Sequence, residues 1–204
     1  MPADCVVLAT RNAAKLRELA RILDSQVPLA GLDAFPGAPD VPETGATFEE
    51  NALLKARAIA AYTHLPAVAD DSGLCVDALN GMPGVLSARW AGGHGDDQAN
   101  LALVLAQLAD VPDPRRGAQF VCAAALVVPS ASPHHRELVV TGNVTGRLTR
   151  APRGGGGFGY DPIFLPDGFD LTTAEMTPEA KDAISHRGRA FRALVPFIKE
   201  VHEP

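Results

Sequence analysis

Apolar residues along this chain occur in two patterns, as short continuous runs and as runs at helical spacing. The run Val6–Ala9 is typical of a short buried strand. It leads through a polar segment into Leu16, Leu19 and Leu23, which recur every three or four residues as on one face of a helix. The first part of the chain therefore predicts a strand, a loop and an amphipathic helix.

Helix start signals occur at three further places. Thr47 and Glu50 stand three residues apart, as in a capping box, and predict a helix that begins directly after Thr47. Asp96 or Asp97 is suited to cap a helix whose leucines and valine point inward. Thr177-Pro178-Glu179 combines a cap, a proline at the first helical position and an early acidic residue. Each signal predicts a separate helix.

The last helix is expected to follow Ser185, whose hydroxyl group is suited to cap it. Leu194 and Ile198 stand four residues apart and are expected on its buried face. Pro196 lies inside this pattern. Because proline has no backbone N–H, we expect Pro196 to kink the helix or to end it early.

Buried strands are predicted at 66–69, 120–128 and 137–141. The first is followed by Asp70-Asp71-Ser72-Gly73, which is typical of a turn, so the acidic pair is expected at the end of a strand. Helices and strands alternate with both local and longer strand pairs, which predicts an α/β fold with a mixed sheet. With 47% hydrophobic residues, residues 1–204 are expected to form a single domain.

Composition excludes several classes of protein. No apolar run of about 18 residues occurs, and the chain has no basic start followed by an apolar stretch, so we expect a soluble, cytoplasmic protein without membrane contact. Cys5, Cys75 and Cys122 form no C-x-x-C pair and are expected to be reduced. Cys75 lacks a paired base and His134-His135 lacks metal-ligand spacing, so both are weak candidates for function.

The formal net charge of -6 lacks the basic surplus that binds nucleic acid, so an anionic substrate must be held by local cations. The segment Thr10-Arg11-Asn12-Ala13-Ala14-Lys15 offers polar side chains and backbone N–H groups at a helix N-terminus. A lysine in a first helical turn opposes the helix dipole, which favours a bound phosphate as its reason. The alternative is a capped helix with Lys15 in solvent. The Walker A pattern is absent.

Acidic residues form a second candidate cluster. Glu43 precedes the second helix, Glu49 and Glu50 lie in its first turn, and Asp70 and Asp71 follow a strand. Carboxylate oxygens of this kind suit Mg²⁺, which takes one or two of them together with substrate phosphates. Successive strand residues point to opposite faces, so one aspartate is expected to be structural. The alternatives are helix capping by the glutamates and a plain turn at the aspartates.

A third cluster is basic and lies late in the chain. Its members Lys181, His186, Arg187 and Arg189 surround the start of the last helix, where cations are unfavourable unless an anionic or acceptor-rich partner is present. Upstream, the glycine run Gly154–Gly157 leads into Phe158-Gly159-Tyr160-Asp161, which is typical of a binding loop with aromatic rings that stack on a base. The alternatives are a solvated basic turn and ordinary core aromatics.

Together and in order, these segments resemble the family of non-canonical purine nucleoside triphosphate pyrophosphatases, also called inosine triphosphate or XTP/dITP pyrophosphatases. The resemblance spans nearly the whole chain. Its matching pieces are Leu8-Ala9-Thr10-Arg11-Asn12 with Lys15, Glu43-Thr44-Gly45 with Phe48 and Glu50-Asn51-Ala52, Ala69-Asp70-Asp71-Ser72-Gly73-Leu74, Pro83-Gly84 with Ser87-Ala88-Arg89, Gly156-Gly157-Phe158-Gly159-Tyr160-Asp161-Pro162, and Lys181 with Ser185-His186-Arg187-Gly188.

The resemblance implies a mixed central sheet flanked by helices, a nucleotide-binding cleft between two lobes, and a homodimer. It implies that Thr10 to Lys15 contacts the phosphate end of the nucleotide, that Glu43 and Asp71 hold Mg²⁺, and that Asp71 is the proton acceptor. The rest of the implied nucleotide site is Ser72, Phe158, Gly159, Tyr160, Asp161, Lys181, His186 and Arg187. The sequence departs from the family at Arg11, where glycine is usual; the larger side chain either crowds the phosphate loop or adds a phosphate contact.

The implied reaction is hydrolysis of ITP, dITP or XTP to the monophosphate and pyrophosphate, with water attacking the α-phosphorus and an alkaline pH optimum. Arg187 only donates hydrogen bonds, so it suits the six-position carbonyl of hypoxanthine and xanthine and mismatches the amine of adenine. Guanine shares that carbonyl, and we expect its two-amino group to be left unpaired or crowded.

Three other function classes compete with this interpretation. A haloacid-dehalogenase-type phosphatase, which releases orthophosphate, also places an aspartate after a strand, but it needs a second one where this chain has Gly73. A non-catalytic purine nucleotide sensor would bind without turnover. A glycosidase-like carboxylate pair at Glu43 and Asp71 would leave the basic clusters unexplained.

Overall fold

The computed structural model describes residues 5–23, 28–129 and 136–202, and the pair His134-His135 lies outside them. The chain divides into two compact units. Unit 1 comprises Met1–Asp71, Cys122–Gly142 and Arg187–Pro204, and unit 2 comprises Ser72–Val121 and Asn143–His186. The expectation of a single domain over 1–204 stays a prediction.

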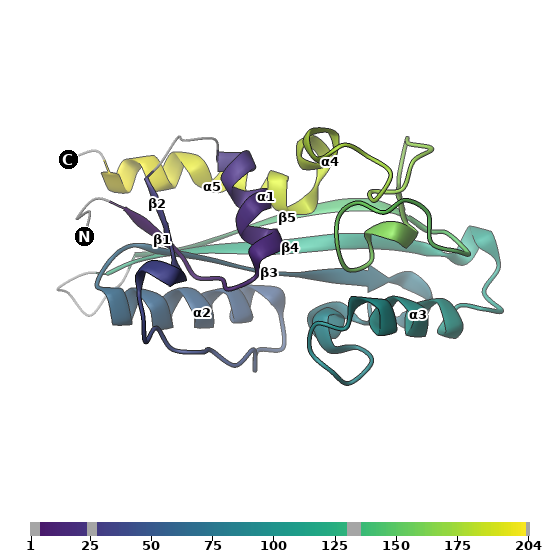
Figure 1. The fold of residues 1–204 in the computed structure, drawn as a ribbon, viewed down its shortest axis with the longest axis horizontal. Helices are drawn as coiled ribbons and strands as arrows, with labels where there is room; N and C mark the ends of the chain where they lie inside the picture. The colour runs from purple at the N-terminus through teal and green to yellow at the C-terminus, as the bar shows by residue number, and fades with distance from the viewer. Residues whose placement is uncertain (1–4, 24–27, 130–135, 203–204) are drawn as a thin grey trace. The chain divides into compact units, whose positions relative to one another are not determined.

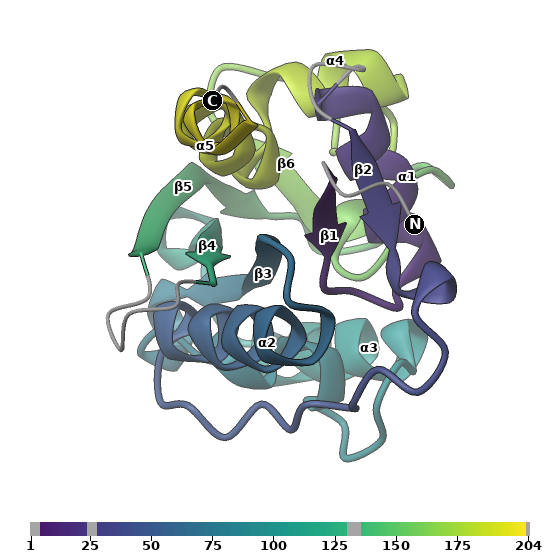
Figure 2. The same ribbon diagram turned by 90° about the vertical axis from the view of Figure 1, so that its left-hand side faces the viewer.

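The described strands form a six-stranded sheet in the order β2-β1-β3-β4-β5-β6 (Figures 1 and 2). β1 pairs in parallel with β2 and β3, whereas β5 pairs antiparallel with β6, so the sheet is mixed as the sequence predicts. The strands are β1 (Val6–Leu8), β2 (Leu29–Gly31), β3 (Ala67–Val76), β4 (Gly117–Val128), β5 (Arg136–Leu148) and β6 (Phe164–Pro166).

Helices flank this sheet, which completes the predicted α/β class. The α-helices are α1 (Ala13–Leu23), α2 (Phe48–Thr63), α3 (Asp97–Gln107), α4 (Pro178–Ile184) and α5 (His186–His202). Short 3-10 helices are η1 (Leu32–Ala34), η2 (Asp77–Leu79), η3 (Gly84–Arg89), η4 (Asp113–Arg115) and η5 (Asp161–Ile163). Within the described residues, no helix combines the length and apolar character needed to cross a membrane.

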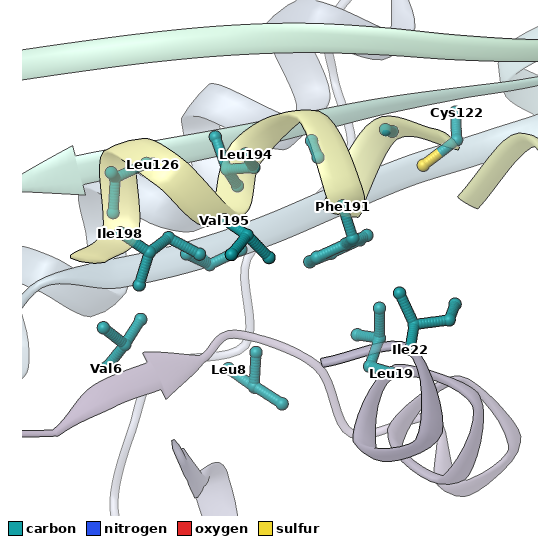
Figure 3. Packing of buried hydrophobic residues seen from close by; sticks show 13 residues of the cluster. Val6, Leu8, Leu19, Ile22, Cys122, Leu126, Phe191, Leu194, Val195 and Ile198 are labelled. Carbon is teal, nitrogen blue, oxygen red and sulfur yellow. The ribbon is translucent and has the colours of Figure 1, made fainter. Parts of the chain in front are cut away.

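Unit 1 has helices on both faces of its strands. Figures 1 and 2 show α2 on one face and α1 with α5 on the other. The core between the strands and α1 with α5 is shown in Figure 3, where side chains of α5 pack against those of β1, β4 and α1. Its buried members are Val6, Leu8, Leu19, Ile22, Val68, Cys122, Ala124, Leu126, Ala190, Phe191, Leu194, Val195 and Ile198.

The start of α2 follows the capping-box signal with one change. The Oγ1 atom of Thr47 accepts a hydrogen bond from the backbone N–H of Glu50 at 3.2 Å, as predicted. The carboxylate of Glu50 accepts from the N–H of Ala46, one residue before the cap, at 2.6 Å. The capping interpretation of Glu50 is therefore confirmed.

Unit 2 places α3 against a second apolar core. Asp96 caps α3, because its Oδ1 atom accepts from the N–H of Ala99 at 2.9 Å. Leu101, Val104 and Leu108 then point inward, as their spacing predicts. They pack with residues of η5 and of β3 to β6, namely Leu74, Val76, Ala118, Phe120, Val144, Leu148, Tyr160, Ile163 and Phe164.

One expectation about element ends is wrong, and one of the two outcomes expected at Pro196 is ruled out. The segment Asp70-Asp71-Ser72-Gly73 is not a turn, because β3 continues through it to Val76. The aspartates fit inside a buried strand here because they have polar and cationic partners. Residue 73 is a glycine for a different reason: a Cβ there would lie 2.5 Å from the carbonyl oxygen of Gly84. Pro196 does not end α5 early, since the helix runs to His202. The buried Leu194 and Ile198 on either side of this exposed proline hold the helix against the core.

The core in Figure 3 makes a testable prediction about α5. Phe191 is fully buried in it, whereas Phe197 on the same helix is 40% exposed. Phe191→Ala should lower the free energy of unfolding by about 3 to 5 kcal/mol, because it removes a large buried ring and leaves a cavity. Phe197→Ala, the matched control, should change it by less than about 1 kcal/mol. Urea denaturation measures both; equal losses would contradict the packing of α5.

Candidate functional site

Adjacent aspartates in β3 point to opposite faces of the strand and contact different helices. On one face, the Oδ2 atom of Asp70 accepts hydrogen bonds from Lys15 Nζ at 2.9 Å and from Arg187 Nε at 3.2 Å. On the other, the Oδ2 atom of Asp71 accepts from Asn51 Nδ2 at 2.9 Å. Asp70 thus contacts α1 and α5, and Asp71 contacts α2. The expectation that the pair cannot face one site is confirmed.

Asp70 belongs to a buried chain of four alternating charges in unit 1. Lys15 pairs with Asp70, Asp70 pairs with Arg187, and Arg187 pairs with Glu18. Burial alone would raise the pKa of Asp70, but the charges of Lys15, Arg187 and Lys55 outweigh it and hold that pKa far below its usual range. Asp70 is therefore ionised at neutral pH, and its role is to compensate buried cations.

This network decides between the alternatives for the basic residues. The side chain of Lys15 is only 15% exposed and has a carboxylate partner, so its placement in open solvent is wrong. Lys181, His186 and Arg187 are buried, so the interpretation as a solvated basic turn is wrong for these three residues, whereas Arg189 is exposed. Lys15, Lys181 and Arg187 each pair with a buried carboxylate.

A second charged group of unit 1 joins Glu43 and Asp71 through a lysine. Lys55 Nζ donates to Glu43 Oε1 at 2.7 Å and lies 3.8 Å from Asp71 Oδ1. The two carboxylates therefore converge on one ammonium group. Burial raises the pKa of Asp71; Lys55 opposes this rise and Glu43 adds to it, and the net shift is upward. The nearby cations thus offset the burial of the Asp71 carboxylate only in part, in contrast to Asp70.

Asn51 fixes the orientation of this group. Its Oδ1 atom accepts from the N–H of Gly45 at 2.7 Å, while its Nδ2 atom donates to Asp71. The amide therefore ties the loop that carries Glu43 to the strand that carries Asp71. Asn51 is fully buried, so its contacts are shielded from water.

Sequence reasoning missed Asn51, Lys55 and Glu18 as members of these clusters. Asn51 and Lys55 stand four residues apart in α2, and Glu18 follows Lys15 by three residues in α1. Such spacings place side chains on one face of a helix. This signal was present in the sequence: it places Asn51 with Lys55 and Glu18 with Lys15, and of these only Lys15 was identified as a site residue.

In unit 2, the turn Phe158–Asp161 is built around a buried carboxylate. Asp161 Oδ2 accepts from the N–H of Phe158 at 2.8 Å and from Lys181 Nζ at 2.7 Å, while its Oδ1 atom accepts from the hydroxyl of Thr173 at 2.7 Å. Lys181 Nζ also lies 5.0 Å from the centroid of the Phe158 ring. The turn and the lysine are thus held together by one aspartate.

The two aromatic residues of the turn differ in exposure. Tyr160 is buried, and its hydroxyl donates to the carbonyl oxygen of Ser87 at 2.9 Å. Burial and the charge of Asp97 both raise the pKa of Tyr160. The interpretation as an ordinary core aromatic therefore applies to Tyr160. Phe158 stays partly exposed and is the ring of this turn that a ligand can reach.

His186 is held by a ring contact in unit 2. Its imidazole stacks on Phe120 with ring centroids 4.9 Å apart and planes at 14°. Phe120 in turn lies 4.5 Å from Phe164, so the histidine rests on the apolar core. The fold thus fixes the plane of the imidazole at the point where α5 begins.

The remaining candidates are the cysteines and Arg11. All three cysteines are free thiols, as predicted, and burial raises the pKa of Cys75 and Cys122, which makes both poor nucleophiles at neutral pH. The Arg11 guanidinium donates to the carbonyl oxygen of Ala38 at 2.6 Å and lies 3.5 Å from Asp40. Arg11 therefore fastens the loop before α1 to the segment after η1.

Comparison with known proteins adds to this geometry. The model of the Ham1 family matches residues 6–197. The chain belongs to the Ham1 family. Its relatives include the dITP/XTP pyrophosphatase of Streptomyces coelicolor, 62% identical over 199 residues, covering 96% of this chain and 98% of the relative. The dITP/XTP pyrophosphatase of Nocardia farcinica is 65% identical over 197 residues, covering 95% and 94%.

Solved structures of Ham1 relatives share the fold. The crystal structure of a nucleoside-triphosphatase, dITP/XTP pyrophosphatase, from Mycobacterium abscessus is 60% identical, with a TM-score of 0.75 over 94% of this chain and 98% of that one. The Ham1 protein of Staphylococcus aureus is 39% identical, with a TM-score of 0.83 over 96% and 98%. The family resemblance read from the sequence is therefore confirmed.

The Asp70 network of this Ham1 chain predicts a pH-dependent stability. Asp70→Asn should lower the free energy of unfolding at neutral pH by about 3 to 5 kcal/mol, because it leaves buried cations without their carboxylate. The folded-state pKa of Asp70 is depressed, so its stabilisation is present above the ordinary pKa of about 3.9 and is lost as pH falls below it.

Urea denaturation of both proteins between neutral pH and the acid limit of folding measures this difference, which should shrink below about pH 4. Asp40→Asn is the matched control, because Asp40 forms only an exposed pair with Arg11. The control should change stability by less than about 1 kcal/mol. A difference between Asp70→Asn and the unaltered protein that grows in acid would contradict the network.

Proposed function

We propose that this Ham1 protein hydrolyses non-canonical purine nucleoside triphosphates, namely dITP, XTP and ITP, to the monophosphate and pyrophosphate. Relatives named dITP/XTP pyrophosphatase are 62% and 65% identical across nearly the whole chain. The structural observation that carries the proposal is the convergence of Glu43 and Asp71 on one cation, Lys55. This arrangement suits the phosphate chemistry that those names describe.

The donor set of unit 1 fits Mg²⁺. Glu43 and Asp71 supply hard carboxylate oxygens to a common position, and the raised pKa of Asp71 indicates negative charge that a further cation would offset. Among residues 5–23, 28–129 and 136–202, no group of three or more histidine, cysteine or acidic side chains is placed to hold a metal. Two carboxylates completed by substrate phosphates match the usual coordination of Mg²⁺. When bound, Mg²⁺ supplies charge neutralisation at the phosphate oxygens.

Asp71 is the proposed proton acceptor. Its incompletely compensated carboxylate is held in one orientation by Asn51, as a base that orients a water molecule must be. Because the pKa of Asp71 is raised, its carboxylate loses its proton at a higher pH than usual, so activity should fall in acid. We expect an alkaline optimum because the family resemblance implies one and because a base that acts on metal-bound water works best at elevated pH. Lys15 and Lys55 would each exchange a carboxylate for substrate phosphate and neutralise its charge.

The other proposed substrate contacts follow the two units. In unit 1, the segment Thr10-Arg11-Asn12-Ala13-Ala14-Lys15 would bind the phosphates at the N-terminus of α1. In unit 2, the partly exposed Phe158 would stack on the base. The remaining proposed contacts are Ser72, Gly159, Tyr160, Asp161, Lys181, His186 and Arg187.

Arg187 is the proposed reader of the purine six-position. Its guanidinium only donates hydrogen bonds, and Nε and Nη1 donate to Asp70 and Glu18. A group that only donates would suit the carbonyl of hypoxanthine and xanthine and mismatch the amine of adenine. The carboxylates hold the guanidinium rigid, which strengthens such discrimination. A homodimer and a cytoplasmic location are further parts of this proposal: the family resemblance implies the first, and the composition of the chain predicts the second.

The reaction is tested by incubating the protein with Mg²⁺ and ITP, dITP, XTP, GTP or ATP separately. We expect monophosphate and pyrophosphate from the first three, little turnover of the other two, and loss of turnover with EDTA. Anion-exchange chromatography and a pyrophosphate assay identify the products. Orthophosphate would indicate a phosphatase, and binding without turnover would indicate a nucleotide sensor.

Asp71→Asn is expected to separate activity from stability. Loss of the base should lower kcat for dITP by roughly 100-fold or more. Because the folded-state pKa of Asp71 is raised, its ionised form costs stability at neutral pH, so the uncharged variant should melt no lower than the unaltered protein. Steady-state kinetics and thermal denaturation measure the two effects. Asp40→Asn, an exposed Asp→Asn control, should keep full activity.

A further inference from the structure

Asp97 is the first residue of α3, but its carboxylate serves a distant segment. Asp96 already caps this helix through the N–H of Ala99. The Oδ2 atom of Asp97 accepts from the backbone N–H of Gly159 at 2.8 Å, across 62 residues of sequence. A carboxylate in a first helical turn is favoured by the helix dipole, which explains the residue type but not this contact.

The contact completes the hydrogen bonding of the turn Phe158–Asp161. Asp161 accepts from the N–H of Phe158, and the N–H of Asp161 donates to the carbonyl oxygen of Phe158 at 3.3 Å. The intervening Gly159 has a φ of +61°, a conformation that favours glycine, and directs its N–H toward Asp97. The turn is therefore held by Asp161 from within and by Asp97 from α3.

The neighbouring tyrosine is held from the same region of unit 2. Tyr160 donates to the carbonyl oxygen of Ser87 in η3, and Asn100 of α3 accepts from the N–H of Ala91 just after η3 at 2.7 Å. Gly159 is thus tied to α3, and the next residue, Tyr160, is tied to η3. The ring of Phe158 takes its direction from backbone atoms that these contacts fix.

We propose that Asp97 is a positioning residue that fixes the Phe158–Asp161 turn and thereby sets the orientation in which Phe158 meets the purine base. The base contact rests on the proposed function. The anchoring of the turn does not, because it involves only protein atoms within unit 2.

The kinetic test compares Asp97→Ala with Asp97→Asn, which keeps one acceptor oxygen. Asp96→Asn is the matched control, because it removes the same charge from the adjacent position and asparagine caps helices as well as aspartate does. Asp97→Ala should raise KM for dITP roughly three- to ten-fold, as expected for the net contribution of one typical hydrogen bond, and leave kcat nearly unchanged. Asp97→Asn should recover most of the loss. An unchanged KM, or an equal rise in Asp96→Asn, would overturn the inference.

Amide hydrogen exchange tests the anchor without nucleotide. The peptide that contains Gly159 should exchange roughly three- to ten-fold faster in Asp97→Ala than in the unaltered protein, and Asp96→Asn should match the latter. If the unaltered protein fails to hydrolyse dITP, the proposed function fails while the exchange result still stands. Unchanged exchange in a folded Asp97→Ala variant overturns the inference and leaves the proposed function intact.

Discussion

Unit 1 depends on the compensation of one buried charge in the middle of a strand. Asp70 is 3% exposed, and an ionised carboxylate in such a place costs several kcal/mol unless cations and hydrogen bonds offset it. The cations come from α1 and α5, which lie far apart in sequence. The two helices can bury their apolar faces in the shared core only where Lys15 and Arg187 also reach Asp70. Packing and electrostatics therefore select the same placement of both helices.

The geometry of β3 also explains why the charge of Asp71 is compensated differently from that of Asp70. Because side chains alternate along β3, Asp71 faces α2 and forms its ion pair with a different lysine from Asp70. This lysine is Lys55, which is also bound by Glu43. One strand thus carries a fully compensated carboxylate beside an incompletely compensated one. The first stabilises the fold, and the second keeps the affinity for protons and cations that a catalytic group needs, at some cost in stability.

Local signals predicted the helices better than the strands. Thr47, Asp96 and Thr177 each cap the helix that their sequence context indicated, because capping depends on residues only a few positions apart. The length of β3 could not be read in this way. An Asp-Asp-Ser-Gly run is typical of a turn, and only partners that are distant in sequence, such as Arg187, make it stable within a buried strand.

The charged clusters around Asp70 and Asp71 likewise depend on partners that are distant in sequence. The family resemblance identified Glu43, Asp71 and Lys15 from their motifs, but it gave no partner for any of them. Lys55, the partner of Glu43 and Asp71, stands four residues after Asn51, and Glu18, the partner of Arg187, stands three residues after Lys15, so periodicity contained part of this information. Which carboxylate receives which cation depends on the tertiary arrangement. The tertiary arrangement also determines the contact of Arg11 with the Ala38 carbonyl oxygen, whereas the sequence left the role of Arg11 undecided.

The glycine run before the aromatic turn is better explained by close approach than by flexibility. A Cβ at Gly157 would lie 2.1 Å from the Asp161 carboxylate, and one at Gly154 would lie 2.6 Å from the backbone of Ala174. Both glycines also have positive φ angles, +70° and +81°. The backbone must therefore pass close to Asp161 if that carboxylate is to accept from Phe158 and Lys181 together. A turn fixed in this way before a ligand binds loses little conformational entropy on binding, which favours selective recognition.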